Sequence, residues 1–347
     1  MIKKIAILGS TGSIGKSLLN LLRNDKNKKI ILLSANRNYR QLIRQAKEFK
    51  VKNIIISNKK NFNKLKNDNR FKNINIYNDY ECFKKIFKNK IDYTMSAIIG
   101  IDGLLPTLKI IKHSKIIAIA NKESIICGWN LIEKELKKYK TKFLPVDSEH
   151  FSIWFDLYSQ NPKNIINKIL ITASGGPFRE KKISSLKNIS IKDAINHPNW
   201  TMGKKISIDS ATMVNKIFEL IEAKNIFNLS YDQLSIIIHP KSYIHALIQY
   251  KNGLSKIILH ETDMRIPIFN TLNFPNIKNY NPNKINFDIL NNLRLSNPNL
   301  QKYPSLKLLK YLPKKSSLFE TIIVSANDEL VSLFLKKKIK FTDITKN

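Results

Sequence analysis

Residues 197–222 hold the densest group of side chains able to do chemistry in this sequence. Asn215, Lys216 and Glu219 are spaced i, i+1 and i+4, so a helix would place all three on one side. An amide and an ammonium group suit a phosphate, and the neighbouring carboxylate suits a metal ion. Ser210 is expected near the N-cap, where free N–H groups and the helix dipole favour an anion. An ordinary amphipathic helix with a Lys216–Glu219 surface pair explains the same spacing.

A loop and a short alternating segment precede this predicted helix. His197, Trp200 and Met202 lie in the loop, and Lys205–Ile208 alternates polar and apolar residues as a strand does. Because residues 196–203 have no strong strand or helix pattern, we expect a mobile loop that closes over a ligand. The alternative for Trp200 is a buried core tryptophan.

Two further carboxylates follow the predicted strand Lys142–Val146. Asp147 and Glu149 at i and i+2 of an extended chain would project from one face, at the carboxyl end of a parallel strand. Together with Glu219 they would form an all-oxygen site, which suits Mg²⁺ or Mn²⁺ and not zinc. A solvated turn is the alternative for the Asp147–Glu149 pair alone.

A glycine-rich turn follows the first predicted strand. Residues 9–15 read G-x-x-G-x-x-G and open a helical pattern, which is typical of a loop that binds a dinucleotide pyrophosphate. After the second strand the chain has no acid to hold the ribose hydroxyls, and Arg37 could pair with a 2′-phosphate. The pattern therefore favours NADP, although Arg37 could equally be one more basic surface residue.

Two other strand ends carry groups that could bind an anion. Lys122 could steer an anion or an enolate-like oxygen, or belong to a capping turn. Ser174 precedes two glycines, which let the backbone close around an oxyanion, although a plain turn is common for such sequences. His245 is compatible with a satisfied strand histidine.

The elements that would position these residues divide the chain in two. In the first half, strand-like runs alternate with helical patterns such as Gly15–Leu22 and Tyr39–Phe49, which predicts a parallel sheet with right-handed crossovers. Those runs are Ile5–Leu8, Ile30–Ser34, Asn53–Ile56, Tyr93–Ala97, Lys115–Ala120 and Lys142–Val146. Further along, consecutive strands indicate an α+β unit with an antiparallel component. They are Ile169–Ala173, Ser235–His239, His245–Tyr250 and Ser255–Leu259.

The predicted class is therefore α/β, with a nucleotide-binding domain over residues 1–146. A central α+β catalytic domain is expected over 147–274, and an Asn- and Pro-rich linker over 275–299. Residues 300–347, with helical patterns at Tyr303–Leu312 and Leu318–Lys338, are expected to form only part of a helical domain.

Composition narrows the class of protein. The chain has 347 residues, is 43% hydrophobic and carries a formal net charge of +34. The lysines are scattered among Asn and Ile, so compositional drift explains the charge better than a nucleic-acid partner. Two cysteines, Cys82 and Cys127, are too few for a disulfide framework. With no signal peptide and no run that could span a bilayer, we expect a cytoplasmic protein without a membrane partner.

Taken together, these motifs resemble the 1-deoxy-D-xylulose 5-phosphate reductoisomerase family, over essentially the whole chain. The blocks that carry the resemblance are GSTGSIG from Gly9, ANKES from Ala120, PVDSEH from Pro145, ASGGPFRE from Ala173, HPNW from His197, SIDSATMVNK from Ser207, IHPKSYIH from Ile238 and DMR from Asp263. The resemblance implies an N-terminal Rossmann-like NADPH-binding domain, a homodimer, and a metal-assisted rearrangement of a ketose phosphate followed by hydride reduction.

The resemblance also implies a role for each site residue. NADPH would be held by Thr11, Gly12, Ser13, Ile14, Asn36, Arg37, Asn38, Asn121, Glu123 and Gly203. The ion, Mg²⁺ or Mn²⁺, would be held by Asp147, Glu149 and Glu219, which with Lys122 form the catalytic set. The substrate, a phosphorylated ketose, would contact Lys122, Ser148, Glu149, Ser174, His197, Trp200, Met202, Ser210, Asn215, Lys216 and Glu219. Trp200 and Met202 would belong to a flap.

The sequence departs from the family pattern in three places. Ile217-Phe218 stands where Gly-Leu is usual, Ile101-Asp102 replaces a small pair, and relatives continue for some tens of residues beyond Ile344.

Two other functions are compatible with parts of the sequence. A plain NADP-dependent dehydrogenase of a phosphorylated substrate would not need the three acids. A nucleic-acid-binding or structural protein would bind DNA in a salt-sensitive way.

Overall fold

The computed structural model describes residues 2–160, 165–200, 202–281, 286–315 and 317–346. Two compact units share the chain, and each unit takes two segments. The first contains Met1–Asp147 and Met264–Tyr280, and the second contains Ser148–Asp263 and Asn281–Asn347. The predicted boundaries differ from this division, because residues 264–280 belong with the first unit and 300–347 with the second. Within the described residues, no helix combines the length and apolar character needed to cross a bilayer.

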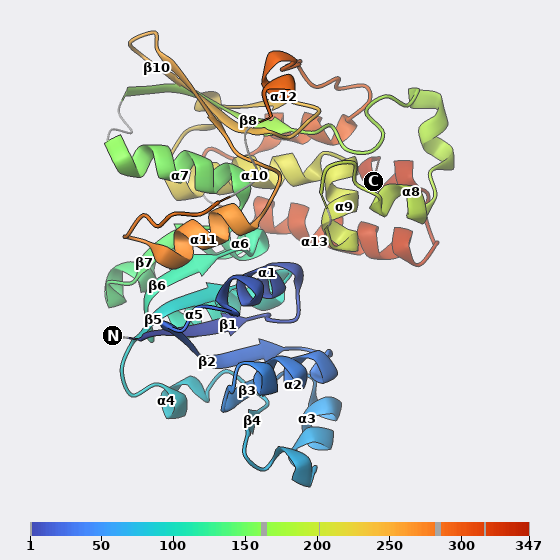
Figure 1. Cartoon of the computed structure of the whole chain (residues 1–347). Helices are drawn as coiled ribbons and strands as arrows, with labels where there is room; N and C mark the ends of the chain where they lie inside the picture. Colours follow the sequence, from blue (N-terminus) through green and yellow to red (C-terminus); the bar gives the residue numbers. More distant parts are fainter. Residues whose placement is uncertain (1, 161–164, 201, 282–285, 316, 347) are drawn as a thin grey trace. The chain divides into compact units, whose positions relative to one another are not determined.

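A seven-stranded parallel sheet forms the centre of the first unit (Figure 1), so the predicted α/β class is confirmed. Its strands are β1 (Lys3–Leu8), β2 (Lys28–Ala35), β3 (Asn53–Ile56), β4 (Asn75–Tyr77), β5 (Ile91–Ser96), β6 (Ser114–Ile119) and β7 (Lys142–Pro145). They lie in the order β4-β3-β2-β1-β5-β6-β7. The order reverses beside β1, and open α/β sheets bind ligands at such a switch point.

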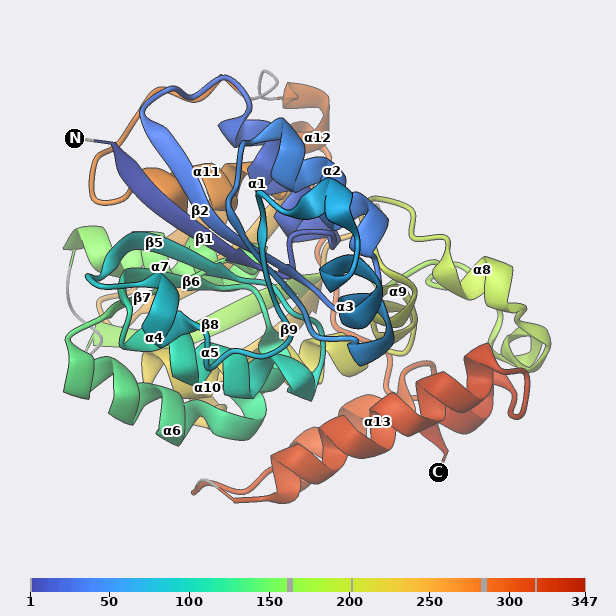
Figure 2. The same cartoon turned by 90° about the horizontal axis from the view of Figure 1, so that it is seen from below.

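Helices cover both faces of this sheet. They are α1 (Ser13–Leu22), α2 (Tyr39–Glu48), α3 (Lys59–Lys66), α4 (Phe83–Ile86), α5 (Leu104–Ile111), α6 (Lys122–Tyr139) and α11 (Arg265–Asn273), with 3-10 turns at Asn69–Phe71 and Ile101–Gly103. Figure 2 shows α1 and α11 on one side of the sheet and α5 and α6 on the other, as right-handed crossovers require. The segment 264–280 joins this unit because α11 packs against α1, and the Tyr93 hydroxyl lies 3.2 Å from Thr271 Oγ1.

A mixed four-stranded sheet, in the order β11-β10-β8-β9, supports the second unit. Its strands are β8 (Ile166–Ala173), β9 (Leu234–Ile238), β10 (Ile244–Tyr250) and β11 (Ser255–Leu259). β10 runs antiparallel to β8 and β11, whereas β8 and β9 are parallel, so the predicted antiparallel component is present. The helices α7 (Ser148–Gln160) and α10 (Val214–Phe227) pack against this sheet (Figure 1).

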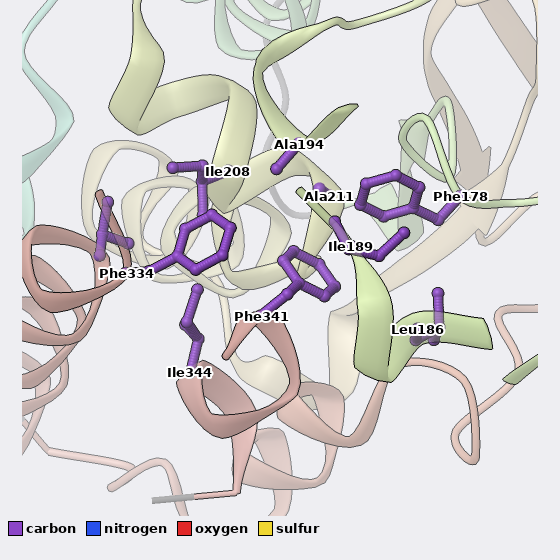
Figure 3. Packing of buried hydrophobic residues seen from close by; sticks show 10 residues of the cluster. Phe178, Leu186, Ile189, Ala194, Ile208, Ala211, Phe334, Phe341 and Ile344 are labelled. Carbon is purple, nitrogen blue, oxygen red and sulfur yellow. The ribbon is translucent and has the colours of Figure 1, made fainter. Parts of the chain in front are cut away.

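The remaining helices of the second unit are α8 (Ile191–Ile195), α9 (Lys204–Ala211), α12 (Phe287–Asn291) and α13 (Phe319–Leu335), with 3-10 segments at Ile183–Asn188, Tyr231–Gln233, Pro304–Tyr311 and Phe341–Thr345. Among these helices, α8 and α13 pack against α9. Ile208 and Ala211 of α9 lie in a buried cluster with Phe334 of α13 and Phe341 after it (Figure 3). The carboxy-terminal helices therefore support α9.

Two local predictions are wrong. Lys205–Ile208 is part of α9 and not a strand, because four alternating residues fit either structure and the buried pair Ile208 and Ala211 has helical spacing. Asp147 and Glu149 do not share an extended segment, since α7 begins at Ser148 and puts Glu149 in its first turn. The predicted linker 275–299 contains α12 and a bridge between Ile238 and Ser296, and its residues 282–285 lie outside the described part.

Candidate functional site

The turn after β1 exposes backbone where a nucleotide phosphate would bind. Gly9 has a φ of +82°, and a Cβ there would lie 2.5 Å from the carbonyl oxygen of Ala97. Gly12 is the N-cap of α1 and has no side chain to cap the first turn. The next residues, Ser13 and Ile14, begin the helix, and their free N–H groups and the helix dipole suit an anion. Thr11 is half-buried beside them.

The turn after β2 presents exposed polar side chains. Asn36, Arg37 and Asn38 are all exposed, and Asn38 caps α2 by accepting a hydrogen bond from the Gln41 amide at 3.3 Å. The Arg37 carbonyl accepts a hydrogen bond from Asn61, which fixes the backbone and leaves the guanidinium to project from the turn. Arg37 is therefore placed to meet an anion from the surrounding solvent.

The start of α6 is a capped helix, so the capping turn that was the alternative for Lys122 is present. The Asn121 side chain accepts a hydrogen bond from the Ser124 amide and donates to the carbonyls of Ile98 and Gly100. Its buried amide thus ties β6 to the segment after β5. Glu123 is also buried, in the first turn of α6. Gly203, the last residue predicted to line the cofactor, is the exposed N-cap of α9 in the second unit.

Three carboxylates converge around the start of α7. Asp147, Glu149 and Glu219 each offer an oxygen atom, and these atoms lie within 4.8 Å of one another. An ion ligated at about 2.0–2.6 Å can be shared by oxygens so spaced, so the set fits Mg²⁺ or Mn²⁺. Asp147 is one residue away from α7, Glu149 lies in its first turn, and Glu219 lies in α10. A second group, Asp147 with His150 and Glu222, meets the same distance criterion.

Lysine ammonium groups neutralise these carboxylates. Lys216 Nζ lies 2.5 Å from Glu149 Oε1 and 2.6 Å from Glu219 Oε2. In the first unit, Lys122 Nζ lies 2.7 Å from Asp147 Oδ2. We call Glu149, Lys216 and Glu219 the acid–lysine cluster. Its lysine ammonium stands in for the positive charge that a bound cation would bring.

The protonation state of Lys216 follows from its neighbours. Burial alone would lower its pKa, but the charges of Glu149 and Glu219, and their hydrogen bonds, raise it well above the ordinary lysine value. The ammonium is therefore fully charged at neutral pH. The Ser148 hydroxyl completes the arrangement by donating to Glu149 Oε2 at 2.5 Å.

The loop after β8 presents a serine hydroxyl. Ser174 Oγ lies 3.0 Å from His197 Nε2 and accepts a hydrogen bond from the Gly176 amide at 3.0 Å. Burial, and then the charge of Lys216, lowers the pKa of His197 to about 4. The ring is neutral at pH 7, and its Nδ1 accepts from backbone amides, so Nε2 carries the proton and donates to Ser174. The Ser174 hydroxyl proton remains to be donated to an incoming anion.

The anion-binding argument for Ser210 as an N-cap is wrong. Ser210 lies in the last turn of α9, and the helix that starts nearby is α10, whose N-cap is Met213 in the left-handed region with a φ of 63°. The second and third residues of α10 are Asn215 and Lys216, so the positive end of that helix dipole lies under them. The predicted set thus comes from a helix end and a helix start joined by a tight turn.

The predicted flap has no regular structure over its described residues, while Thr201 lies outside them. Two anchors hold it: His197 Nδ1 accepts from the Asn199 and Trp200 amides at 3.1 Å, and the Asn199 side chain donates to the Pro240 carbonyl at 2.7 Å. Trp200 is half-buried, with its ring centroid 6.2 Å from that of His245. Met202 is also half-buried. Trp200 is therefore not a core tryptophan.

Histidine 245 has more neighbours than a simple strand histidine. Its Nε2 lies 3.1 Å from the His260 carbonyl, and its ring stacks on His260 with centroids 3.7 Å apart. The hydrogen bond expected of a satisfied strand histidine is thus present. The His245 ring also packs edge-on against the Trp200 ring.

Several supporting residues were not predicted. Arg179 donates to the Ser174 carbonyl and the Tyr303 hydroxyl donates to the Gly175 carbonyl, each at 2.7 Å, which holds the glycine turn in place. His150 Nε2 lies 2.9 Å from the Glu219 carbonyl, which positions the backbone of α10. A histidine directly after the Asp147-Ser148-Glu149 motif is a usable sequence signal for His150, but no local pattern points to Tyr303.

Comparison with known proteins agrees with this geometry. The family model described as 1-deoxy-D-xylulose 5-phosphate reductoisomerase matches residues 5–128. Models of carboxy-terminal domains of the same enzyme match residues 143–227 and 259–347.

Curated relatives carry the same description. The protein from Pelagibacter ubique (strain HTCC1062) is 58% identical over 348 residues, which covers 99% of this chain and 89% of the relative. The protein from Clostridium acetobutylicum is 41% identical over 347 residues, covering 99% of this chain and 90% of the relative. Both comparisons span nearly the whole of each sequence.

Solved structures are similar over the same extent. The reductoisomerase from Zymomonas mobilis in complex with NADPH has a TM-score of 0.88 at 34% identity, covering 100% of this chain and 90% of that one. A DOX-P reductoisomerase in complex with NADPH, fosmidomycin and magnesium has a TM-score of 0.91 at 36% identity, covering 99% and 87%. These matches extend over both units and all the motifs described above. The chain therefore belongs to the 1-deoxy-D-xylulose 5-phosphate reductoisomerase family.

Proposed function

We propose that this chain is an enzyme that converts 1-deoxy-D-xylulose 5-phosphate into 2-C-methyl-D-erythritol 4-phosphate, with NADPH as the reductant and Mg²⁺ or Mn²⁺ as the ion. This is an isomerisation followed by a reduction, in the non-mevalonate route to isoprenoids. The observation that carries the proposal is the convergence of three carboxylates, from the start of α7 and from α10, beside Asn215 and Lys216 in the first turn of α10. A plain dehydrogenase has no use for that acid set.

NADPH fits the first unit. The turn from Thr11 to Ile14 would take the pyrophosphate on free backbone amides, and residues 36–38 would take the adenosine end. Arg37, which stands where an acid would hold unphosphorylated ribose, favours the 2′-phosphate. Asn121, Glu123 and Gly203 are proposed to complete the cofactor site.

The carboxylate set fits a hard divalent cation. We propose Asp147, Glu149 and Glu219 as its ligands, because they offer only oxygen atoms at a suitable spacing. When bound, the ion would supply Lewis acidity and a template for the ketose oxygens. His150 would hold Glu219 in place through the backbone of α10.

The substrate would be held from two ends. Its phosphate would accept hydrogen bonds from Ser174, Ser210, Asn215 and Lys216, with His197 fixing the orientation of Ser174. Its reacting end would lie against Lys122, Ser148 and Glu149. The flap residues Trp200 and Met202 would then cover the substrate and exclude water, so the phosphate contacts would supply the energy for closure.

A direct assay of NADPH oxidation tests this proposal. A mixture of purified protein, NADPH, deoxyxylulose phosphate and Mn²⁺ should lose the near-ultraviolet absorbance of NADPH, and the product should be identified by NMR as methylerythritol phosphate. Chelation with EDTA should stop the reaction, and added Mn²⁺ should restore it. Reduction of phosphorylated aldehydes without a metal would support the dehydrogenase alternative. Salt-sensitive DNA binding without NADPH binding would support the nucleic-acid alternative.

We further propose that the enzyme is a cytoplasmic homodimer. The dimer rests on the family resemblance, and the reducing location is supported by free cysteines at both positions, Cys82 and Cys127. Light scattering coupled to size exclusion should give twice the chain mass of 40.2 kDa. A monomer at micromolar concentration would contradict the proposed homodimer. Localisation outside the reducing cytoplasm would contradict the proposed location.

A further inference from the structure

The side chains proposed to grip the phosphate are bonded to the proposed metal ligands. Lys216 Nζ bridges Glu149 and Glu219 at 2.5 and 2.6 Å, and the Asn215 amide donates to Glu219 Oε1. Both oxygens of Glu219 are thus contacted by residues that are also proposed to bind the phosphate. Asn215 and Lys216 would thus serve two kinds of partner: the carboxylates that they contact in this structure and the phosphate of the proposed substrate.

These bonds conflict with a bound ion. A divalent cation between Glu149 and Glu219 would take the lone pairs that now face Lys216, and two cations a few ångströms apart repel each other. Lys216 is only 7% exposed, so it cannot simply turn into water. A buried ammonium that loses its carboxylates needs another anion, because an unpaired buried charge is costly.

The only anion that the proposed reaction brings to this place is the substrate phosphate. Lys216 is the third residue of α10, and its four-carbon stem lets the ammonium move while the backbone stays fixed. Asn215 lies one residue earlier, so both donors can change partner together by side-chain rotation.

We propose that Lys216 is a transfer lysine: it neutralises Glu149 and Glu219 before the metal binds, and on metal binding it moves, with Asn215, to the substrate phosphate. This inference rests on the proposed function and deepens it. Because coupling between two ligands is reciprocal, metal should tighten phosphate binding and phosphate should tighten metal binding by the same factor. Lys216 is here a positioning residue for the metal site and a binding residue for the phosphate.

Direct attraction between the ion and the phosphate would also couple the two ligands. The two explanations separate when the lysine is removed. Attraction between the ligands persists in Lys216→Gln, whereas coupling through the lysine disappears. The lysine mechanism also predicts that Lys216→Gln binds metal more tightly than wild type when phosphate is absent, since the competing ammonium has gone.

The test measures Mn²⁺ binding by the EPR signal of free Mn²⁺, on the full chain without nucleotide or substrate. Methylphosphonate serves as the phosphate probe. In wild type, saturating methylphosphonate should lower the Kd for Mn²⁺ about tenfold, within the usual 5- to 150-fold range of such couplings. In Lys216→Gln the effect should fall below about twofold. Lys256→Gln is the matched control, because Lys256 pairs with Asp156 of α7 at 3.0 Å and should keep the wild-type coupling.

Equal coupling in wild type and Lys216→Gln would overturn the proposal, and so would a wild type that shows no coupling. A crystal structure with Mn²⁺ alone is a second test that needs no variant. Lys216 Nζ should lie more than about 4 Å from both carboxylates, beyond ion-pair distance, and an ammonium still bonded to both would overturn the proposal. These ion measurements do not depend on turnover, so failure of the proposed reaction would be seen separately in the NADPH assay.

Discussion

The turn after β1 and the acid–lysine cluster offer different parts of the chain to a ligand. The turn offers backbone amides from neighbouring residues, shaped by Gly9 with its positive φ. The acid–lysine cluster offers side chains from α7 and α10, 67 residues apart, which are already bonded to one another. One region is ready for its ligand, and the other must exchange partners to accept it.

This contrast separates two ways of preparing a site. A backbone cradle is shaped by local conformation, and at the start of α1 the N-cap is Gly12, which has no side chain to take up the free N–H groups. A set of like charges instead needs a counter-charge to be stable before the ligand arrives. A substitution in one region should therefore leave ligand binding by the other region nearly unchanged. The expected effects are given from the largest to the smallest.

Glu219→Gln should abolish most turnover. The substitution removes one anionic ligand and the partner of both Asn215 and Lys216, and loss of several kcal/mol of charge stabilisation corresponds to about 10²–10³-fold in kcat. NADPH affinity, measured by fluorescence, should stay within about twofold of wild type because the cofactor turn is local. Activity within tenfold of wild type would contradict the assignment of Glu219.

Gly9→Ala should destabilise the first unit. The new Cβ would lie 2.5 Å from the Ala97 carbonyl oxygen at a φ of +82°, which we expect to cost about 3 kcal/mol. Gly100→Ala is the matched control, since its φ is +76° but nothing lies within 4 Å, and about 1–2 kcal/mol is expected. Urea unfolding of both variants measures the difference. Equal losses would mean that close approach at Gly9 is unimportant.

Arg37→Asp should reverse or narrow the preference for NADPH. Loss of a charge-assisted contact to the 2′-phosphate is worth about 1.5–3 kcal/mol, or about 10- to 100-fold in Kd. Binding of NADH and of Mn²⁺ should change little. The exposed Arg44 of α2 provides the control, and Arg44→Asp should keep the preference. Equal Kd values for the two cofactors in wild type would remove the basis of the argument.

Trp200→Ala should raise KM for the substrate about tenfold, which corresponds to about 1.4 kcal/mol of lost contact. The ring is half-buried and lies against His245, so the melting temperature should fall far less than for a core tryptophan, whose loss costs about 3–5 kcal/mol. Differential scanning fluorimetry and steady-state kinetics on one preparation distinguish the two cases. A large drop in melting temperature would make Trp200 structural.

His197→Gln should flatten the dependence of stability on pH. Burial lowers the pKa of His197 to about 4, below its ordinary value of 6.5. Below pH 6.5 the unfolded chain therefore takes up a proton that the folded chain does not, so stability is complete above pH 6.5 and declines towards pH 4. Urea midpoints at pH 7 and pH 5 should differ less in the variant. An unchanged difference would show that His197 is not the group responsible.

Sequence was a good guide where structure is local. Strands such as Asn53–Ile56 have apolar, β-branched runs, and the glycine turn after β1 combines local spacing with its place between strand and helix. It failed at Lys205–Ile208, where four residues do not distinguish a strand from a helix, and at β4, whose three residues Asn75–Tyr77 carry too little pattern.

The site was predictable in its residue types but not in its bonding. Acids and lysines in these motifs indicated a metal and a phosphate, yet no spacing in the sequence shows that Lys216 pairs with Glu149 as well as with Glu219. The supports from Tyr303 and Arg179 also depend on tertiary packing. Roles for the individual residues remain predictions that the variants above will test.

The buried cluster behind α9 has a consequence for adaptation. Ile208 and Ala211 flank Ser210 in sequence and rest on Phe334 and Phe341 (Figure 3), so a change of side-chain volume there would tilt the serine without touching any ligand. Under selection for altered binding of a phosphate-bearing ligand, substitutions should therefore arise in this hydrophobic cluster as well as among the proposed binding residues. Such variants would escape a survey restricted to the active site.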